Sequence, residues 1–332
     1  MMRIIKELLL WLLFLLVILA GLFAYYAHSP IPLERTPFEF TLKQGSSLKS
    51  AASQIGKAGG LDSQWLFVML GRGMGKAARI KPGNYQLEHE VTPLQLLNII
   101  SKGQIAQSSL TIIEGSTFRQ LRVMLDAEPT LRHDSAPLSD EEILKRIGAS
   151  ETVAEGLFFP DTYNYANGSS DLIVLKRSYQ LMQRKLQENW KDRDANLPFD
   201  TPYQALILAS IVEKETGQPS DRPMIASVFI NRLRKNMRLQ TDPSVIYGIG
   251  EKFDGNLRKN DLLRDSPYNT YTRSGLTPTP IALPGEAAIR AVLHPAPSKA
   301  LYFVARGDGS SQFSNTLIDH NNAVNRYQLK RK

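Results

Sequence analysis

The residues of this chain best suited to chemistry are two acids that follow an apolar run. Residues 205–212 are almost wholly apolar, and Glu213 and Glu215 come directly after them. The run predicts a buried helix, and Gly217 beyond it suits the left-handed cap that ends many helices. At about 100° per residue, Glu215 lies on the side of bulky aliphatic residues, and Glu213 lies near the opposite side. The two acids should therefore have different surroundings.

The surroundings of Glu215 predict a carboxyl group that keeps its proton near neutral pH. Aliphatic neighbours and the negative end of the helix dipole both disfavour a carboxylate, so both should raise the pKa of Glu215. A carboxylic acid of raised pKa is what a general acid for glycosidic cleavage needs. Position alone favours a simpler interpretation, in which Glu215 is a solvated residue that ends a helix beside Lys214.

Four stretches of the sequence carry a resemblance to known cell-wall enzymes. In the pattern A-S-x-x-E-K-E-T of residues 209–216, a Glu followed directly by a hydroxyl residue is similar to the Glu-Ser/Thr signature of lysozyme-like lytic transglycosylases. Residues 155–163, 227–248 and 266–271 resemble the endolytic murein transglycosylase family called MltG or YceG-like. The resemblance extends over most of the chain from Gly115 onward.

This resemblance implies an enzyme that cuts nascent peptidoglycan strands internally and so terminates their elongation. It implies cleavage of the bond between N-acetylmuramic acid and N-acetylglucosamine without water, which leaves 1,6-anhydro-N-acetylmuramic acid ends. The general acid and base would be Glu215, with Glu213 as the alternative. Hydroxyl, amide, charged and aromatic groups suit a saccharide, and the candidate substrate-binding residues with such groups are Thr216, Asn231, Arg232, Gln240, Thr241, Asp242, Tyr268, Asn269 and Tyr271.

Two other functions stay open from the sequence. A lysozyme-type muramidase would use Asp242 as the second carboxylate that glycoside hydrolysis normally needs. Asp242 also has a structural explanation, as an N-cap followed by a proline at the first helical position. The other function is a non-enzymatic scaffold that binds peptidoglycan. His320 could belong to the site, although a surface position is the simpler interpretation.

The N-terminal residues predict a single membrane span. Residues 8–27 form an uninterrupted apolar run of about the length that crosses a bilayer. Arg3 and Lys6 precede it, so we expect residues 1–7 in the cytoplasm, the rest outside, and the chain in the inner membrane. A cleaved signal peptide is the alternative, but residues 24–27 make a poor cleavage site.

The remaining sequence predicts an α+β fold in two parts after a linker over residues 28–37. Residues 38–107 show strand, glycine turn and helix signals and resemble a LysM-type glycan-binding module, which would be membrane-proximal. Residues 108–332 would form a larger mixed α/β catalytic domain. Residues 110–125 echo residues 40–55, which suggests a second LysM-like unit. Further along, Ser220 is the expected cap of a helix that runs to Leu233.

The composition of the chain limits which partners and cofactors we expect. The chain carries 40 Lys and Arg against 32 Asp and Glu, a net charge of +8, without the aromatic-interleaved basic motif of nucleic-acid modules. It has no cysteine, and its five histidines show no paired helical spacing, so we expect no metal and no cofactor. The expected partners are peptidoglycan strands, the membrane and, from the topology, a cell-wall synthase.

Overall fold

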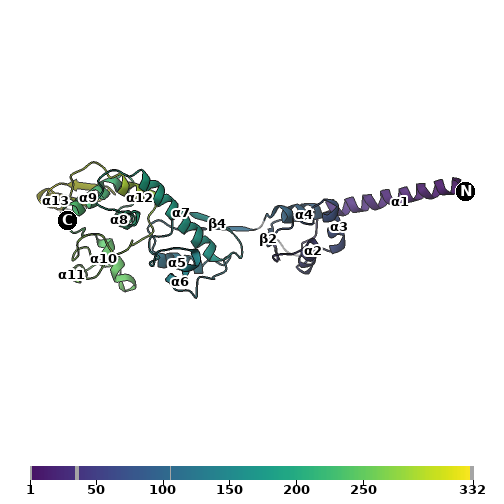
Figure 1. Cartoon of the computed structure of the whole chain (residues 1–332), viewed down its shortest axis with the longest axis horizontal. Coiled ribbons are helices and arrows are strands. Elements are labelled where there is room, and N and C mark those ends of the chain that lie inside the picture. The colour runs from purple at the N-terminus through teal and green to yellow at the C-terminus, as the bar shows by residue number, and fades with distance from the viewer. Residues whose placement is uncertain (1, 34–36, 105, 330–332) are drawn as a thin grey trace. The chain divides into compact units, whose positions relative to one another are not determined.

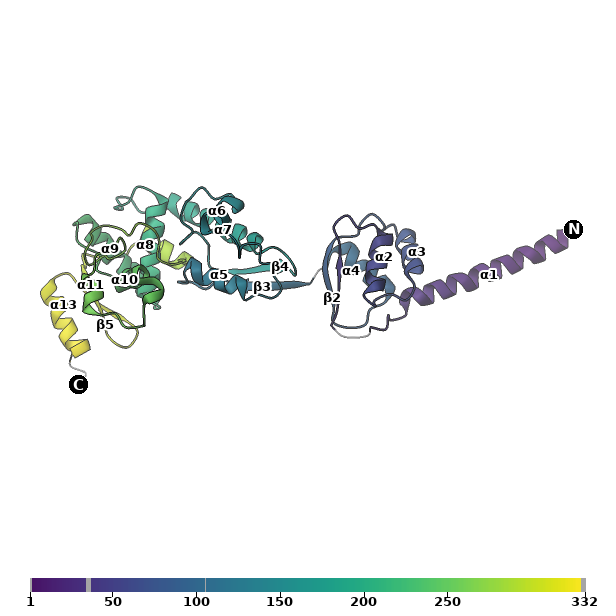
Figure 2. The same cartoon turned by 90° about the horizontal axis from the view of Figure 1, so that it is seen from below.

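The computed structural model describes residues 2–33, 37–104 and 106–329 and shows a mixed helix and strand fold (Figures 1 and 2). The predicted α+β class is confirmed at this level. The chain forms two compact units, one of residues 1–108 with 164–169 and the other of residues 109–163 with 170–332. The predicted assignment of residues 38–107 to a LysM-like domain stays a prediction.

The first helix, α1 (Met2–His28), is apolar and largely exposed. Its segment Ile4–His28 has a mean hydropathy of 2.8 and is the one helix of the described residues that is long and apolar enough to cross a membrane. The predicted span over residues 8–27 lies inside it. At the end of the helix, Ala27 is 4% exposed and belongs to the core of the first unit.

The first unit packs helices against a small antiparallel sheet. Its elements are β1 (Phe38–Leu42), α2 (Leu48–Lys57), α3 (Gln64–Gly73), β2 (Gly83–Leu87) and α4 (Pro93–Lys102). Phe38, Phe40 and Leu42 alternate with exposed residues along β1, and Phe40 lies opposite Tyr85 of β2. This alternation is the period-2 pattern that the sequence predicted.

The same order of elements recurs in the next part of the chain. There, β3 (Gln107–Thr111), α5 (Phe118–Asp126), α6 (Asp140–Ile147) and β4 (Thr162–Ala166) follow one another, and β3 pairs with β4 (Figure 2). Asn167, just after β4, hydrogen-bonds with Asn84, Ala106 and Ser108. These bonds explain why residues 164–169 belong to the first unit.

Helix α8 (Pro202–Glu215) lies at the centre of the second unit, in contact with α7 (Asp171–Lys191), α9 (Arg222–Arg234) and α12 (Glu286–Leu293) (Figure 1). All of residues 205–212 are buried, so the predicted buried helix is confirmed. Pro202 in its first turn and a capping box between Thr201 and Gln204 fix where the helix begins.

Three predicted helix caps are wrong. The cap of α8 is Thr216 in an extended conformation, and Gly217 is not among the residues with positive φ. The Thr216 hydroxyl accepts a hydrogen bond from the Gln218 amide, which closes a local turn in place of a left-handed cap. The N-cap of α9 is Asp221 and not Ser220.

The third wrong cap is that of α10 (Asp242–Ile249). Its N-cap is Thr241, and Asp242 is already its first helical residue.

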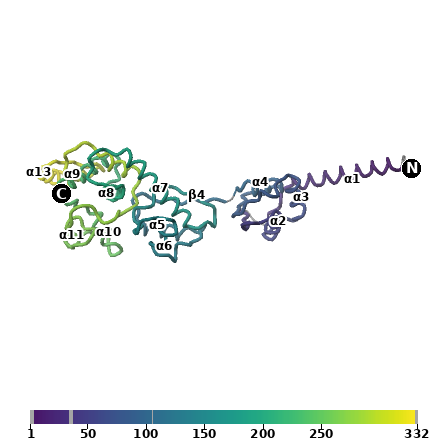
Figure 3. Tube along the Cα trace, in the orientation of Figure 1, coloured from purple at the N-terminus to yellow at the C-terminus, as the bar shows by residue number. Residues whose placement is uncertain are grey.

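Further elements of the second unit follow α10. They include α11 (Lys259–Leu263), the antiparallel hairpin of β5 (Tyr302–Ala305) and β6 (Ser311–Ser314), and α13 (Leu317–Val324). The hairpin and α13, yellow in Figure 3, contact each other.

Candidate active site

A cleft of about 590 Å³ in the second unit brings Glu215 together with residues from several elements. Some lining residues come from the ends of α8 and α9, the start of α10, the residues just before α10, and Tyr271. Others come from β5, α13 and the residues after α13. The lining residues are Glu215, Arg232, Leu239, Gln240, Asp242, Tyr271, Tyr302, Phe303, Val304, Ala305, Leu317, His320, Val324 and Gln328.

The carboxyl group of Glu215 is partly buried and accepts a hydrogen bond from the hydroxyl group of Thr241. Burial raises the pKa of Glu215 to about 7, with a further upward contribution from the Asp242 charge. The Thr241 hydrogen bond and the Arg232 charge oppose this rise in pKa. The direction agrees with the prediction, and it gives the cleft a carboxyl group that can donate and then accept a proton near neutral pH.

Thr241 is held so that its hydroxyl can reach Glu215. Its side chain is 1% exposed, and its amide donates to the Thr270 hydroxyl over 3.0 Å. Its carbonyl accepts from the Ser244 hydroxyl over 2.8 Å. Because this N-cap hydroxyl bonds to Glu215, it does not cap α10. Gln240, just before it, has a φ of 51°, a conformation that non-glycine residues rarely adopt and that clusters at functional sites.

Arg232 lines the cleft and is 8% exposed. Its Nε donates to the Leu301 carbonyl over 2.7 Å, and its Nη1 donates to the Leu239 carbonyl over 2.7 Å. Burial lowers the pKa of Arg232. The guanidinium therefore links the residues just before α10 to those just before β5 and places a positive charge near Glu215.

Asp242 and Tyr271 are paired at the edge of the cleft. The Tyr271 hydroxyl donates to Asp242 Oδ1 over 2.5 Å. Burial, then this hydrogen bond and the Asp242 charge, raise the pKa of Tyr271. Asp242 therefore lines the same cleft as Glu215, with one carboxylate oxygen engaged by a phenol.

Glu213, the alternative catalytic residue, does not line this cleft. Its side chain is 5% exposed and pairs with Arg222 over 3.0 Å. Its second oxygen accepts from the Gly285 amide over 2.9 Å. Breaking such a buried pair is costly, because it leaves an uncompensated charge. Glu213 therefore has a structural role, and the helix periodicity correctly predicted its separation from Glu215.

Five of the nine predicted substrate-binding residues lie outside the lining of the cleft: Thr241, which bonds to Glu215, and four others. Asn269 is fully buried, and its amide donates to the carbonyls of residues 261, 262 and 264, so we assign it a structural role. Asn231 donates to the carbonyls of residues 298 and 300. Tyr268 bonds to the Thr279 hydroxyl over 2.9 Å, and Thr216 closes the turn after α8. The cleft lining thus contains Arg232, Gln240, Asp242 and Tyr271 of the predicted set, and Thr241 is hydrogen-bonded to Glu215.

Another buried acid, Glu155, belongs to the stretch 155–163. It is 6% exposed and accepts hydrogen bonds from the Phe118 amide over 3.0 Å and the Tyr247 hydroxyl over 3.2 Å. Burial raises the pKa of Glu155 to about 7. It does not line the cleft, so we regard it as a link between α5 and α10.

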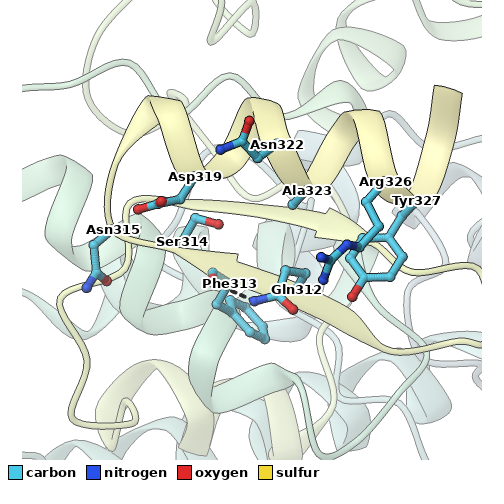
Figure 4. A pocket seen from close by; sticks show the side chains of 9 residues that line it. All are labelled: Gln312, Phe313, Ser314, Asn315, Asp319, Asn322, Ala323, Arg326 and Tyr327. Atoms are coloured by element: carbon cyan, nitrogen blue, oxygen red, sulfur yellow. Dashed lines mark hydrogen bonds between the residues drawn. The ribbon is translucent and has the colours of Figure 1, made fainter. Parts of the chain in front are cut away.

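A second hollow, of about 420 Å³, lies between β6 and α13 (Figure 4). Its lining includes Gln312, Asp319, Asn322 and Arg326, and none of the predicted site residues. The Asp319 carboxylate accepts from the Thr316 hydroxyl at the start of α13. Within the described part of the chain, no group of three or more His, Asp or Glu is arranged to hold a metal ion.

Comparison with known proteins identifies the family. A family model described as the YceG-like family matches residues 40–326. The chain belongs to the YceG-like family. An endolytic murein transglycosylase of Bacillus subtilis is 31% identical over 93% of this chain and 91% of its own length. One from Streptococcus pneumoniae D39 is 26% identical over 91% of this chain, which spans 61% of that relative.

A solved structure supports the same family. The crystal structure of a YceG-like protein from Listeria monocytogenes matches with a TM-score of 0.55 and 28% identity, and covers 86% of this chain and 97% of that one. The predicted family is thus confirmed by sequence and by fold. The enzyme class predicted for the chain agrees with the names of the curated YceG-like relatives.

A pH dependence of stability follows from the raised pKa of Glu215. The folded state holds this proton more tightly than the unfolded state, so the stabilisation is complete below the unfolded pKa and is lost as pH rises to about 7. Glu215→Gln removes the ionisation. We expect the melting temperature of the variant to exceed that of the parent by more at about pH 8 than at about pH 5. Thermal unfolding at both pH values checks this, and equal differences would contradict it.

The hydrogen bond from the Thr241 hydroxyl should lower the pKa of Glu215. Thr241→Val keeps the side-chain shape and removes the donor, so we expect the pKa of Glu215 to rise. Carboxyl ¹³C NMR titration of the purified YceG-like chain measures the change. Thr216→Val is the matched control, since Thr216 adjoins Glu215 in sequence but its hydroxyl accepts from Gln218. A titration that moves equally in both variants would refute the assignment.

Proposed function

We propose that this chain is an endolytic lytic transglycosylase that cuts peptidoglycan glycan strands with Glu215 as its general acid and base. The observation that carries the proposal is the partly buried Glu215 carboxyl group, poised near neutral pH in an open cleft. Its family membership and the names of its relatives support the same activity. Internal cuts in nascent strands would end their elongation.

The proposed reaction needs one carboxyl group in two protonation states. Protonated Glu215 donates its proton to the glycosidic oxygen as the bond from that oxygen to C1 of N-acetylmuramic acid breaks. The resulting carboxylate then takes the proton of the C6 hydroxyl of the same sugar, whose oxygen bonds to C1. The products are a 1,6-anhydro end and a free hydroxyl on N-acetylglucosamine, with no water consumed. Because the nucleophile belongs to the substrate, a second carboxylate is unnecessary.

A lysozyme-type hydrolase is the second candidate, because Asp242 lines the same cleft. Hydrolysis would need Asp242 as a nucleophile or as a base for water. Its hydrogen bond from Tyr271 lowers its availability for either role. The single-carboxyl reaction therefore fits the cleft better.

The test of this proposal is cleavage of purified glycan strands, with product ends read by mass spectrometry. We expect the parent to yield anhydro ends and Glu215→Gln to lose at least about a hundredfold in rate, as for a general acid. Asp242→Asn is the discriminating control, since it should keep measurable cleavage and anhydro ends. Full activity in Glu215→Gln, or reducing ends that disappear in Asp242→Asn, would overturn the assignment.

We also infer a LysM-like glycan-binding role for residues 38–107, with a second LysM-like unit around residues 110–125. The repeated order of strand, helix, helix and strand supports this inference. Such modules would hold a glycan strand near the catalytic unit without cutting it.

The third part of the proposal concerns location. We infer that α1 anchors the chain in the inner membrane as a single pass, with its N-terminus in the cytoplasm and the catalytic unit outside. The apolar helix and the Arg3 and Lys6 charges before it support this orientation. An enzyme anchored there would meet strands as they are made, so a cell-wall synthase is a reasonable partner.

The absence of cysteine makes the orientation directly measurable. A membrane-impermeant maleimide added to spheroplasts should label His89→Cys, which lies in an exposed position of the first unit. It should label Glu7→Cys only after the membrane is permeabilised. The reverse pattern would refute the orientation.

A further inference from the structure

The part of the cleft lining that β5 and α13 contribute is mainly apolar and aromatic. It includes Phe303 and Val304 of β5 and Leu317 and Val324 of α13. Leu317 is 55% exposed. Apolar and aromatic side chains that line a pocket suit the apolar faces of a bound ligand, with a few polar groups fixing its orientation.

His320 is the polar residue that α13 contributes to this part of the cleft lining. Its neighbours Asp319 and Asn322 line the separate hollow on the β6 side of the helix (Figure 4). The His320 ring stacks on Tyr302, with centroids 5.3 Å apart and planes 24° apart. Tyr302 in turn lies 5.2 Å from the guanidinium carbon of Arg232. The imidazole is therefore held within the same set of side chains that surrounds Glu215.

The two ring nitrogens of His320 have different surroundings. Nδ1 is buried and has no hydrogen-bond partner, and Nε2 makes no hydrogen bond to any residue that the structure describes. Burial, and then the Arg232 charge, lower the pKa of His320, so the ring is neutral near neutral pH. A buried N–H without an acceptor is costly. The single ring proton is therefore favoured on Nε2, which makes this nitrogen a donor.

We propose that His320 contacts the substrate, and that its Nε2–H donates a hydrogen bond to a hydroxyl or acetamido oxygen of the glycan strand in the cleft. Tyr302 fixes the plane of the ring, and the apolar residues beside it support the sugar. The identity of the ligand rests on the proposed function. The contact itself rests on the position of His320 in the cleft and on its unpartnered nitrogens.

The test measures binding of soluble, uncrosslinked glycan strands by titration calorimetry, with Glu215→Gln in every protein to prevent turnover. A glutamine places its amide nitrogen near the Nε2 position, whereas an asparagine places it near the Nδ1 position. We expect His320→Ala and His320→Asn to weaken binding about tenfold, and His320→Gln to stay within about threefold of the parent. A merely structural role would not distinguish Gln from Asn in this way.

His294→Ala is the matched control, since His294 bonds to Asp194 over 2.8 Å and does not line the cleft. Unchanged affinity in a folded His320→Ala variant would overturn this inference and leave the proposed function intact. Equal effects of His320→Gln and His320→Asn on the affinity would do the same. If the parent neither binds strands nor cleaves them, the proposed function and this inference fall together.

Discussion

The hydrogen bond from Thr241 to Glu215 is the contact on which the cleft depends. It joins the C-terminal end of α8 to the N-terminal end of α10, and the amide and carbonyl of Thr241 are themselves fixed by Thr270 and Ser244. A carboxyl group that ends a helix is normally free to turn toward solvent. Here a buried hydroxyl holds it while burial keeps its pKa high. Thr241 thus fixes the orientation of the carboxyl group, while burial outweighs the lowering effect of this hydrogen bond on the pKa of Glu215.

The three charged residues at the end of α8 make different contacts and so have different roles. Glu213 is neutralised by Arg222 and bonded to the Gly285 amide, and Lys214 donates to the Gly115 carbonyl over 3.0 Å. These contacts fasten the last turn of the helix to other parts of the second unit. Glu215 is left to face the cleft. For the proposed reaction a rigid last turn matters, because a general acid must reach its oxygen at hydrogen-bond distance.

The sequence predicted those features that depend on local periodicity. The apolar run gave a buried helix, and its 3.6-residue repeat separated Glu213 from Glu215. The Thr241 contact joins residues 26 apart and depends on how α10 packs, which no local pattern contains. Tyr302 and His320 lie farther along the chain and reach the cleft only through the β5–β6 hairpin and α13. The predicted cap positions were wrong by one residue. For α10, the neighbours Thr241 and Asp242 are both residue types that favour the N-cap position, so the sequence did not distinguish them.

The bonds of Asn167 have a bearing on how this chain would respond to proteases. Residues 164–169 follow a segment of the second unit in sequence, yet Asn167 among them is hydrogen-bonded to Asn84, Ala106 and Ser108 of the first unit. A single nick in the long segment between Ser109 and Tyr163 would therefore not by itself shed the downstream fragment. The two pieces would stay associated through these bonds. A cut between α1 and β1 would likewise leave α1 packed on the first unit, because Ala27 belongs to the core of that unit.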